Sequence, residues 1–213
     1  MTTPEHTLIG ILGAMAIGLH TRLGWVAIAF AAVVSNIPDV DGLPMLVDME
    51  RFETGHRVWG HNILAITVTT IFVALLQFHV RWIERIAMRS SRFLPSDTHI
   101  QDISNAPSIS LAALILIGLM FQCIHLVCDI TVSGGQGLSD WHVKPFWPFS
   151  EAGYVLPLIP WGDAGPTVIM MLGVIGVAKL GNAKRIATVT LAILFAYMIS
   201  RGYARGAFMP FDT

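Results

Sequence analysis

Long apolar runs separated by three polar segments set the pattern of this chain. Residues 63–80 and 109–127 approach the roughly 20 apolar residues that a helix needs to cross a bilayer. Two shorter runs, 166–180 and 186–200, flank the polar sequence GNAKR and predict a helical hairpin. The pattern therefore predicts an all-α fold, that of a polytopic integral membrane protein.

The N-terminal apolar stretch, residues 8–37, is interrupted by the sequence HTRLG at residues 20–24. It allows either one long tilted helix or two half-length helices folded back on each other. Each half-length helix would extend only about 18–20 Å at 1.5 Å per residue. Such a hairpin would dip into the bilayer and return, with Arg22 at the turn held by protein or water rather than by lipid.

Composition agrees with a membrane protein. Hydrophobic residues make up 54% of the chain and charged residues 13%, whereas soluble domains carry about a quarter charged residues. The net charge of −1 argues against nucleic acid as an electrostatic partner. The start, MTTPEHT, has no basic residue, so no secretory signal peptide is predicted. We expect a single membrane-embedded domain over residues 1–213.

The pentapeptide HLVCD places two ionisable residues at the end of a predicted membrane helix. His125 and Asp129 are four residues apart and therefore project from the same face. Ionisable groups inside membrane segments are costly and usually functional. The pair could ligate one cation, or form a hydrogen-bonded pair that holds helices together.

The sequence NIPDVDG adds two carboxylates just after the first apolar stretch. Pro38 disfavours a helical residue before it, and Gly42 releases the chain, so Asp39 and Asp41 are expected on a turn. Such a turn can present carboxylates to a cation. The two residues could equally be solvated loop charges.

The sequence HRVWGH precedes the 63–80 run. His56 and His61 are five residues apart, about 140° around a regular helix, so they would not chelate one ion from such a helix. They could do so from a loop-to-helix junction, or serve two adjacent ions. Arg57 and His61, four apart, would share a helix face, and Arg57 could hold an anionic substrate oxygen.

The order of crossings brings these residues to one membrane face. His56 and His61 begin one predicted span, whereas His125 and Asp129 end the span that returns. The carboxylate turn precedes the first of these spans and arrives at the same face. This coincidence favours a metal site over the alternatives for each motif alone.

Taken in order, PDVD, HRVWGH, HLVCD and PFWPFS, with an N-terminal histidine at His6, resemble the YdjM-like family of membrane-bound metal-dependent hydrolases. The motifs fall within residues 1–150, and the C-terminal hairpin of 151–213 carries none. The family is distantly similar to zinc-dependent phospholipase C and single-strand nucleases. The resemblance implies His125 and Asp129 as central ligands. It also implies three further ligands: His6, one of the two carboxylates of the turn, and one of the two histidines of HRVWGH.

The resemblance and the motifs together suggest hydrolysis of a phosphoester, on a lipid or lipid-linked substrate, by water activated on one or two divalent ions. Zinc is favoured by the mixed His/Asp set, with manganese or iron as alternatives. Arg57 would stabilise charge, and whichever of Asp39 and Asp41 is not a ligand would accept the proton. Trp59, Trp141, Phe146 and Trp147 would wall the site.

Two rivals remain open, a metal or proton transporter and a non-catalytic scaffold with a structural metal. A transporter would need its site near the middle of the bilayer, reachable from both faces. The candidates instead cluster at helix ends, which favours an enzyme.

Basic residues predict the orientation in a bacterial or archaeal inner or plasma membrane. Short loops rich in Lys and Arg face the cytoplasm. The end opposite the site should carry seven of the 13 basic residues: Arg81, Arg85, Arg89, Arg92, Lys179, Lys184 and Arg185. The site and both termini are therefore expected to face outward.

Overall fold

The computed structural model describes residues 1–90, 107–134 and 140–208, so Arg92 lies outside the described residues. Helices dominate this part of the chain, which contains two isolated β-bridges but no β-strand. The all-α prediction is confirmed. In chain order the helices are α1 (Thr3–Ala16), α2 (Leu19–Arg22), α3 (Trp25–Val34), the 3₁₀ helix η1 (Pro38–Leu46), α4 (Met49–Gly55), α5 (Ile63–Val80), α6 (Trp82–Ser90), α8 (Leu111–Thr131), α9 (Ala164–Leu180) and α10 (Ala183–Ala204).

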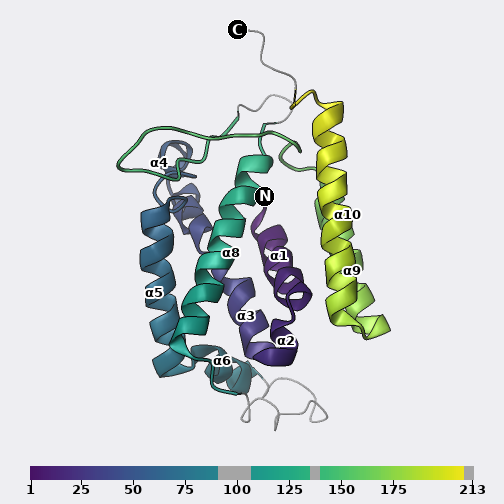
Figure 1. Cartoon of the computed structure of the whole chain (residues 1–213). Coiled ribbons are helices and arrows are strands. Elements are labelled where there is room, and N and C mark those ends of the chain that lie inside the picture. Colours follow the sequence, from purple (N-terminus) through teal and green to yellow (C-terminus); the bar gives the residue numbers. More distant parts are fainter. Residues whose placement is uncertain (91–106, 135–139, 209–213) are drawn as a thin grey trace.

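Three described helices, α5, α8 and α10, are long and apolar enough to cross a membrane. A fourth candidate is the pair of α3 and η1, which is bent by 55° at its break, and α9 is a shorter apolar helix. The bounds of α5 match the predicted run. Helix α8 continues to Thr131 and therefore keeps His125 and Asp129 within regular helix, on one face. The helices form an elongated bundle, in which α1 begins and α10 ends at the same end (Figure 1).

The N-terminal stretch forms the predicted pair of helices folded back on each other. Helices α1 and α3 pack side by side, joined by the single turn of α2. Gly18 and Gly24 flank α2 with φ of 78° each, a positive value that glycine adopts without a steric penalty. A Cβ on Gly10 would lie 2.8 Å from the carbonyl oxygen of Ala31, so the close approach of the two arms depends on this glycine.

The depth of this hairpin differs from the expectation. Helix α3 contacts α6, which follows α5, so the turn reaches the end of the bundle opposite the start of α1 (Figure 1). The helices of the hairpin are long enough to reach this end, because α1 is about 21 Å long and α2 adds another turn. Arg22 is exposed at that end of the bundle rather than enclosed by protein.

Buried polar contacts fix the start of α1, which carries His6. Thr2 and Glu5 form a capping box, in which Glu5 Oε2 accepts from the Thr2 backbone N–H at 2.8 Å. The other Glu5 oxygen accepts from Thr167 Oγ1 at 2.7 Å, which ties α1 to α9. Asp163 caps α9 and accepts from the Tyr197 hydroxyl at 2.7 Å, which ties α9 to α10. His6 is therefore held in a defined position.

Candidate metal centre

A buried cluster of histidine and aspartate side chains lies at one end of the bundle. It gathers residues from four places: the first turn of α1, η1, the junction before α5, and the last turns of α8. The side chains of His6, Asp41, His61, His125 and Asp129 are each at most 1% exposed. Burial of so many ionisable groups is costly unless they pair with each other or bind a metal.

Four of the residues can offer one ligand atom each to a single ion. The ligand atoms of His6, Asp39, His125 and Asp129 all lie within 4.8 Å of one another. His6 Nε2 is 3.1 Å from Asp129 Oδ1, and the rings of His6 and His125 stack with centroids 3.6 Å apart. These four residues come from α1, η1 and α8, so a bound ion would join three parts of the chain.

His61 adjoins this group on the other oxygen of Asp129. Its Nε2 lies 3.0 Å from His125 Nε2, 3.1 Å from Asp129 Oδ2 and 3.7 Å from Asp39 Oδ1. His125 Nε2 is 3.4 Å from Asp39 Oδ1 and 3.6 Å from Asp129 Oδ2. Ligand atoms around a tetrahedral zinc ion are about 3.3 Å apart at the usual bond lengths. These five distances are therefore close to those between the ligands of a small divalent ion.

Hydrogen bonds behind the cluster fix the orientation of two histidine rings. His125 Nδ1 donates to the backbone carbonyl oxygen of Ser35 at 2.6 Å, so its Nε2 presents a lone pair to the centre. His61 Nδ1 bonds Asp41 Oδ2 at 2.8 Å, which leaves its Nε2 for the centre in the same way. Burial alone would lower the pKa of His61, but its bonds to Asp129 and Asp41 raise it.

The two carboxylates of η1 have different surroundings. Asp39 faces the centre and accepts a hydrogen bond from Thr3 Oγ1 at 3.3 Å. Asp41 lies behind His61, is fully buried, and also bonds His56 Nδ1 at 3.0 Å. The residues form a short 3₁₀ helix that begins at Pro38, rather than a simple turn. Because successive 3₁₀ residues are about 120° apart, the two side chains point in different directions.

The expectation that Arg57 and His61 share a helix face is wrong. Arg57 has φ of 63°, and the residues between α4 and α5 are not helical. Its guanidinium is buried at the end of α8, where Nη1 donates to the carbonyl oxygen of Asp129 at 3.0 Å and Nη2 to that of Val132 at 3.1 Å. Nη1 also donates to Trp141 O at 3.1 Å. Arg57 therefore satisfies the last carbonyls of α8 and holds Asp129 in place.

Comparison with known families gives one match. The model of the YdjM inner membrane protein family matches residues 1–208. The chain belongs to this family. No curated protein and no solved structure matches.

This membership agrees with the apolar helices of the structure and makes the chain an integral inner-membrane protein. The match covers the C-terminal hairpin as well as the motifs of the first 150 residues. The further similarity to zinc-dependent phospholipase C stays a prediction.

A cavity of about 390 Å³ adjoins the centre of this YdjM-family protein, and Asp39 is the residue of the centre that lines it. Its polar lining also includes His56, Thr2 and Thr3. Its apolar walls include Leu43 and Leu46 of η1, together with residues of the 140–163 loop. Of the four predicted aromatic wall residues only Trp141 lines this cavity, and Trp161 joins it, whereas Trp59, Phe146 and Trp147 do not.

Several contributors carry no signal in the sequence. The Ser35 carbonyl is a backbone group, which no motif can reveal. Gly60 donates its N–H to Asp41 Oδ2 at 2.9 Å, and a Cβ there would lie 2.3 Å from Pro38 O. Asn62 caps α5 and accepts from Ala65 N at 2.8 Å. Gly60 and Asn62 thus fix the turn that delivers His61.

The remaining histidines lie outside the cluster. His20 and His79 belong to the opposite end of the bundle, and His142 is exposed in the loop after α8. His99 lies outside the described residues. The N-terminal ammonium group of Met1 forms an ion pair with Asp129 Oδ1.

Proposed function

We propose that this YdjM-family protein is a membrane-bound metal-dependent hydrolase that cleaves a phosphoester of a lipid or lipid-linked substrate. The observation that carries the proposal is the convergence of His6, Asp39, His125 and Asp129 next to a cavity with apolar walls, which Asp39 lines. A metal that only joined helices would not need such a cavity. A cavity at one end of helices that can cross a membrane would be accessible to an amphiphilic substrate.

The chemistry of the ligand atoms supports zinc, with manganese or iron as alternatives. Asp39, His125 and Asp129 would hold an ion together with His61 or His6. Because His61 and His6 bond opposite oxygens of Asp129, this carboxylate could also join two ions. A bound ion would supply a Lewis acid that polarises the phosphoryl oxygen and lowers the pKa of a water molecule.

His56 is the residue best placed to accept the proton of that water. It lines the cavity, and its Nδ1 bonds Asp41 Oδ1 at 3.0 Å. Asp41 is fully buried and already accepts from Gly60 N and His61, so it acts through His56 rather than directly. A carboxylate behind a histidine fixes its tautomer and stabilises its charged form, the usual arrangement of a general base.

The walls of the cavity support an amphiphilic substrate. Leu43, Met45 and Leu46 line it from η1 and are still 58%, 51% and 76% exposed. Exposed apolar side chains of this kind can pack against a hydrocarbon chain. A phosphoester at the polar floor and an apolar tail along η1 would satisfy both parts of the cavity.

A transporter is less compatible with the packing beneath the centre. Moving from the cluster toward the basic end, the next turns of α1, α3 and α8 contribute Leu12, Phe30 and Phe121, each at most 1% exposed. These side chains form close-packed core. Gln122 and Thr70 are buried beside it, where Gln122 Nε2 donates to Thr70 Oγ1 at 2.8 Å. Passage of an ion would require this core to separate.

The test uses the full chain, purified and loaded with zinc, assayed against phospholipids and polyprenyl phosphates for release of phosphate or alcohol. We expect metal-dependent turnover that Asp39→Asn abolishes. His79→Ala is the matched control, because His79 ends α5 at the far end of the bundle. Full metal content with no turnover across the panel would favour a structural metal. A chain that retains no metal would refute the centre itself.

A further inference from the structure

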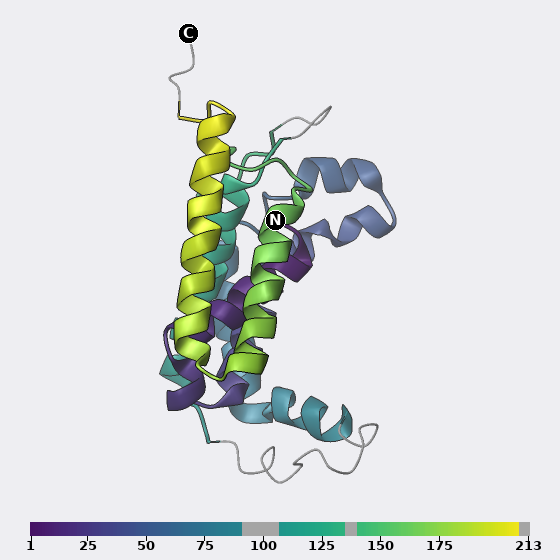
Figure 2. The ribbon, with the colours of Figure 1, turned by 90° about the vertical axis from the view of Figure 1, so that its right-hand side faces the viewer.

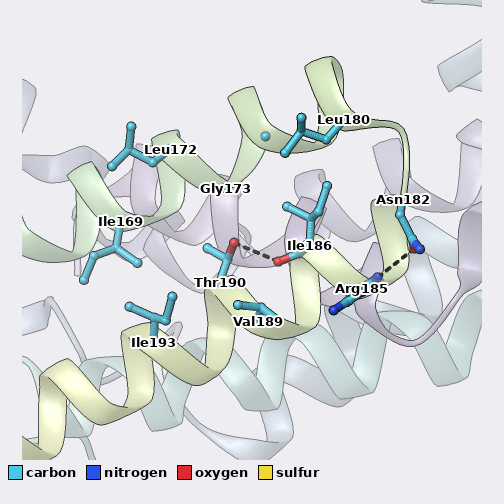
Figure 3. A pocket seen from close by; sticks show the side chains of 11 residues that line it. Ile169, Leu172, Gly173, Leu180, Asn182, Arg185, Ile186, Val189, Thr190 and Ile193 are labelled. Carbon is cyan, nitrogen blue, oxygen red and sulfur yellow. Dashed lines mark hydrogen bonds between the residues drawn. The ribbon is translucent and has the colours of Figure 1, made fainter.

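A second cavity, of about 640 Å³, lies between α9 and α10. Its lining includes residues beside the turn between these helices, at the end of the bundle opposite the start of α1 (Figure 2). Figure 3 shows that branched aliphatic side chains from both helices line it. Leu172 and Leu180 come from α9, and Ile186, Val189 and Ile193 from α10. Leu172 is 63% exposed and Val189 49%, so the groove opens away from the bundle.

The floor of the groove is apolar although it contains a hydroxyl. Gly173 and Thr190 meet there, and a Cβ on Gly173 would lie 2.4 Å from Thr190 Cγ2. Thr190 Oγ1 donates to the backbone carbonyl of Ile186 at 2.8 Å (Figure 3), so it has no free donor. A hydrocarbon chain can therefore lie on this floor without burying an unsatisfied polar group.

One end of the groove is strongly basic. Asn182 and Arg185 line it there, and Lys179 and Lys184 belong to the same turn. All three cations are exposed, residues 164–204 contain no Asp or Glu, and none of the three pairs with a carboxylate of the described residues. Asn182 Oδ1 caps α10 by accepting from Arg185 N at 3.3 Å, which leaves its amide N–H groups free to donate.

We propose that this groove binds an anionic phospholipid from the leaflet at the basic end. One acyl chain lies along α10 from Ile186 to Ile193, and the phosphate contacts Arg185 and the Asn182 amide. Charge complementarity favours this occupant, because Lys and Arg beside a membrane surface attract anionic headgroups. A second copy of the chain is disfavoured. A twofold interface at this groove would bring its Arg185 against an identical cation.

The test reconstitutes the full chain in phosphatidylcholine vesicles that contain a trace of photoactivatable lipid. The probe is phosphatidylglycerol, or phosphatidylcholine with the same acyl chains, and peptide mass spectrometry locates the label after irradiation. We expect the phosphatidylglycerol probe to label residues 169–193 preferentially. Arg185→Gln should lower this preference about fivefold, the effect of one cationic contact. Arg89→Gln, on α6 at the same end, should not change it.

A second pair of variants tests the groove rather than its charge. Val189→Trp fills the groove from an exposed position and should remove the label of both probes at this site. Phe195→Trp, on an exposed part of α10 outside the groove, should retain it. Equal labelling by the two probes, labelling that Arg185→Gln leaves unchanged, or cross-links between two copies of the chain would each overturn the proposal.

Discussion

Replacing Asp41 by Asn separates the binding of metal from the activation of water. Asp41 Oδ2 accepts from Gly60 N and His61 Nδ1, and its Oδ1 bonds His56 Nδ1. An asparagine has one acceptor oxygen, and it serves two donors if it faces Gly60 and His61. Its NH₂ group then faces His56. The orientation of His61, and with it the metal centre, is preserved.

The consequence for His56 is a change of tautomer. Its Nδ1 must accept from the amide, so the ring proton moves to Nε2, the nitrogen available to a water molecule in the cavity. A histidine with a proton on that nitrogen cannot act as a base. Loss of a general base costs about 10²–10⁴-fold in turnover, or about 2.7–5.5 kcal/mol. Removing a buried carboxylate behind a ligand should lower metal affinity by about 10–100-fold.

The assay therefore has two readouts on the same preparation. Competition with a chromophoric chelator gives the metal affinity, and hydrolysis at saturating metal gives the turnover. We expect Asp41→Asn to bind metal at saturating concentrations and to lose turnover. His142→Ala, at an exposed loop histidine, is the control. Unchanged turnover in Asp41→Asn would refute the role of His56, whereas failure to bind metal at any concentration would place Asp41 among the ligands.

Three further outcomes follow from the structure. Asp129→Asn should strip the metal from the purified protein, because this carboxylate bonds both His6 and His61. Elemental analysis that finds full metal content would contradict the centre. Asp163→Ala should lower the free energy of unfolding by about 1–2 kcal/mol through loss of a helix cap. Although burial alone would raise the pKa of Asp163, the hydrogen bond from Tyr197 and other donors lowers it. The contribution of Asp163 to the free energy of unfolding is therefore present near neutral pH and lost as the pH falls through its folded-state pKa. The difference in stability between variant and parent, measured by chemical denaturation, should disappear in acid. Cysteine labelling in intact cells should modify Thr3→Cys but not Thr21→Cys. The two exposed positions lie at opposite ends of the bundle, and the basic end should face the cytoplasm. The reverse result would mean that the basic end faces outward.

The sequence was enough to predict the long apolar helices, and to predict that the candidate ligands meet at one end of them. An apolar run of bilayer length has to be helical, since lipid offers no partner for the backbone N–H and C=O groups. Helix α5 accordingly begins and ends where the pattern places it. The spacing of His125 and Asp129 predicts a shared face for the same reason, because α8 is regular through both residues.

Which residues of the polar junctions face the centre depends on how the helices pack, and the sequence pattern does not predict it. The 3₁₀ geometry of η1 turns Asp39 toward His125 and Asp41 toward His56, a difference that two carboxylates in one motif do not reveal. The left-handed conformation of Arg57 removes the helical register that would have paired it with His61. These junctions lack a repeating pattern, because their backbone follows from contacts with distant segments and not from local periodicity. Side-chain direction in such segments is therefore fixed only once the helices have packed.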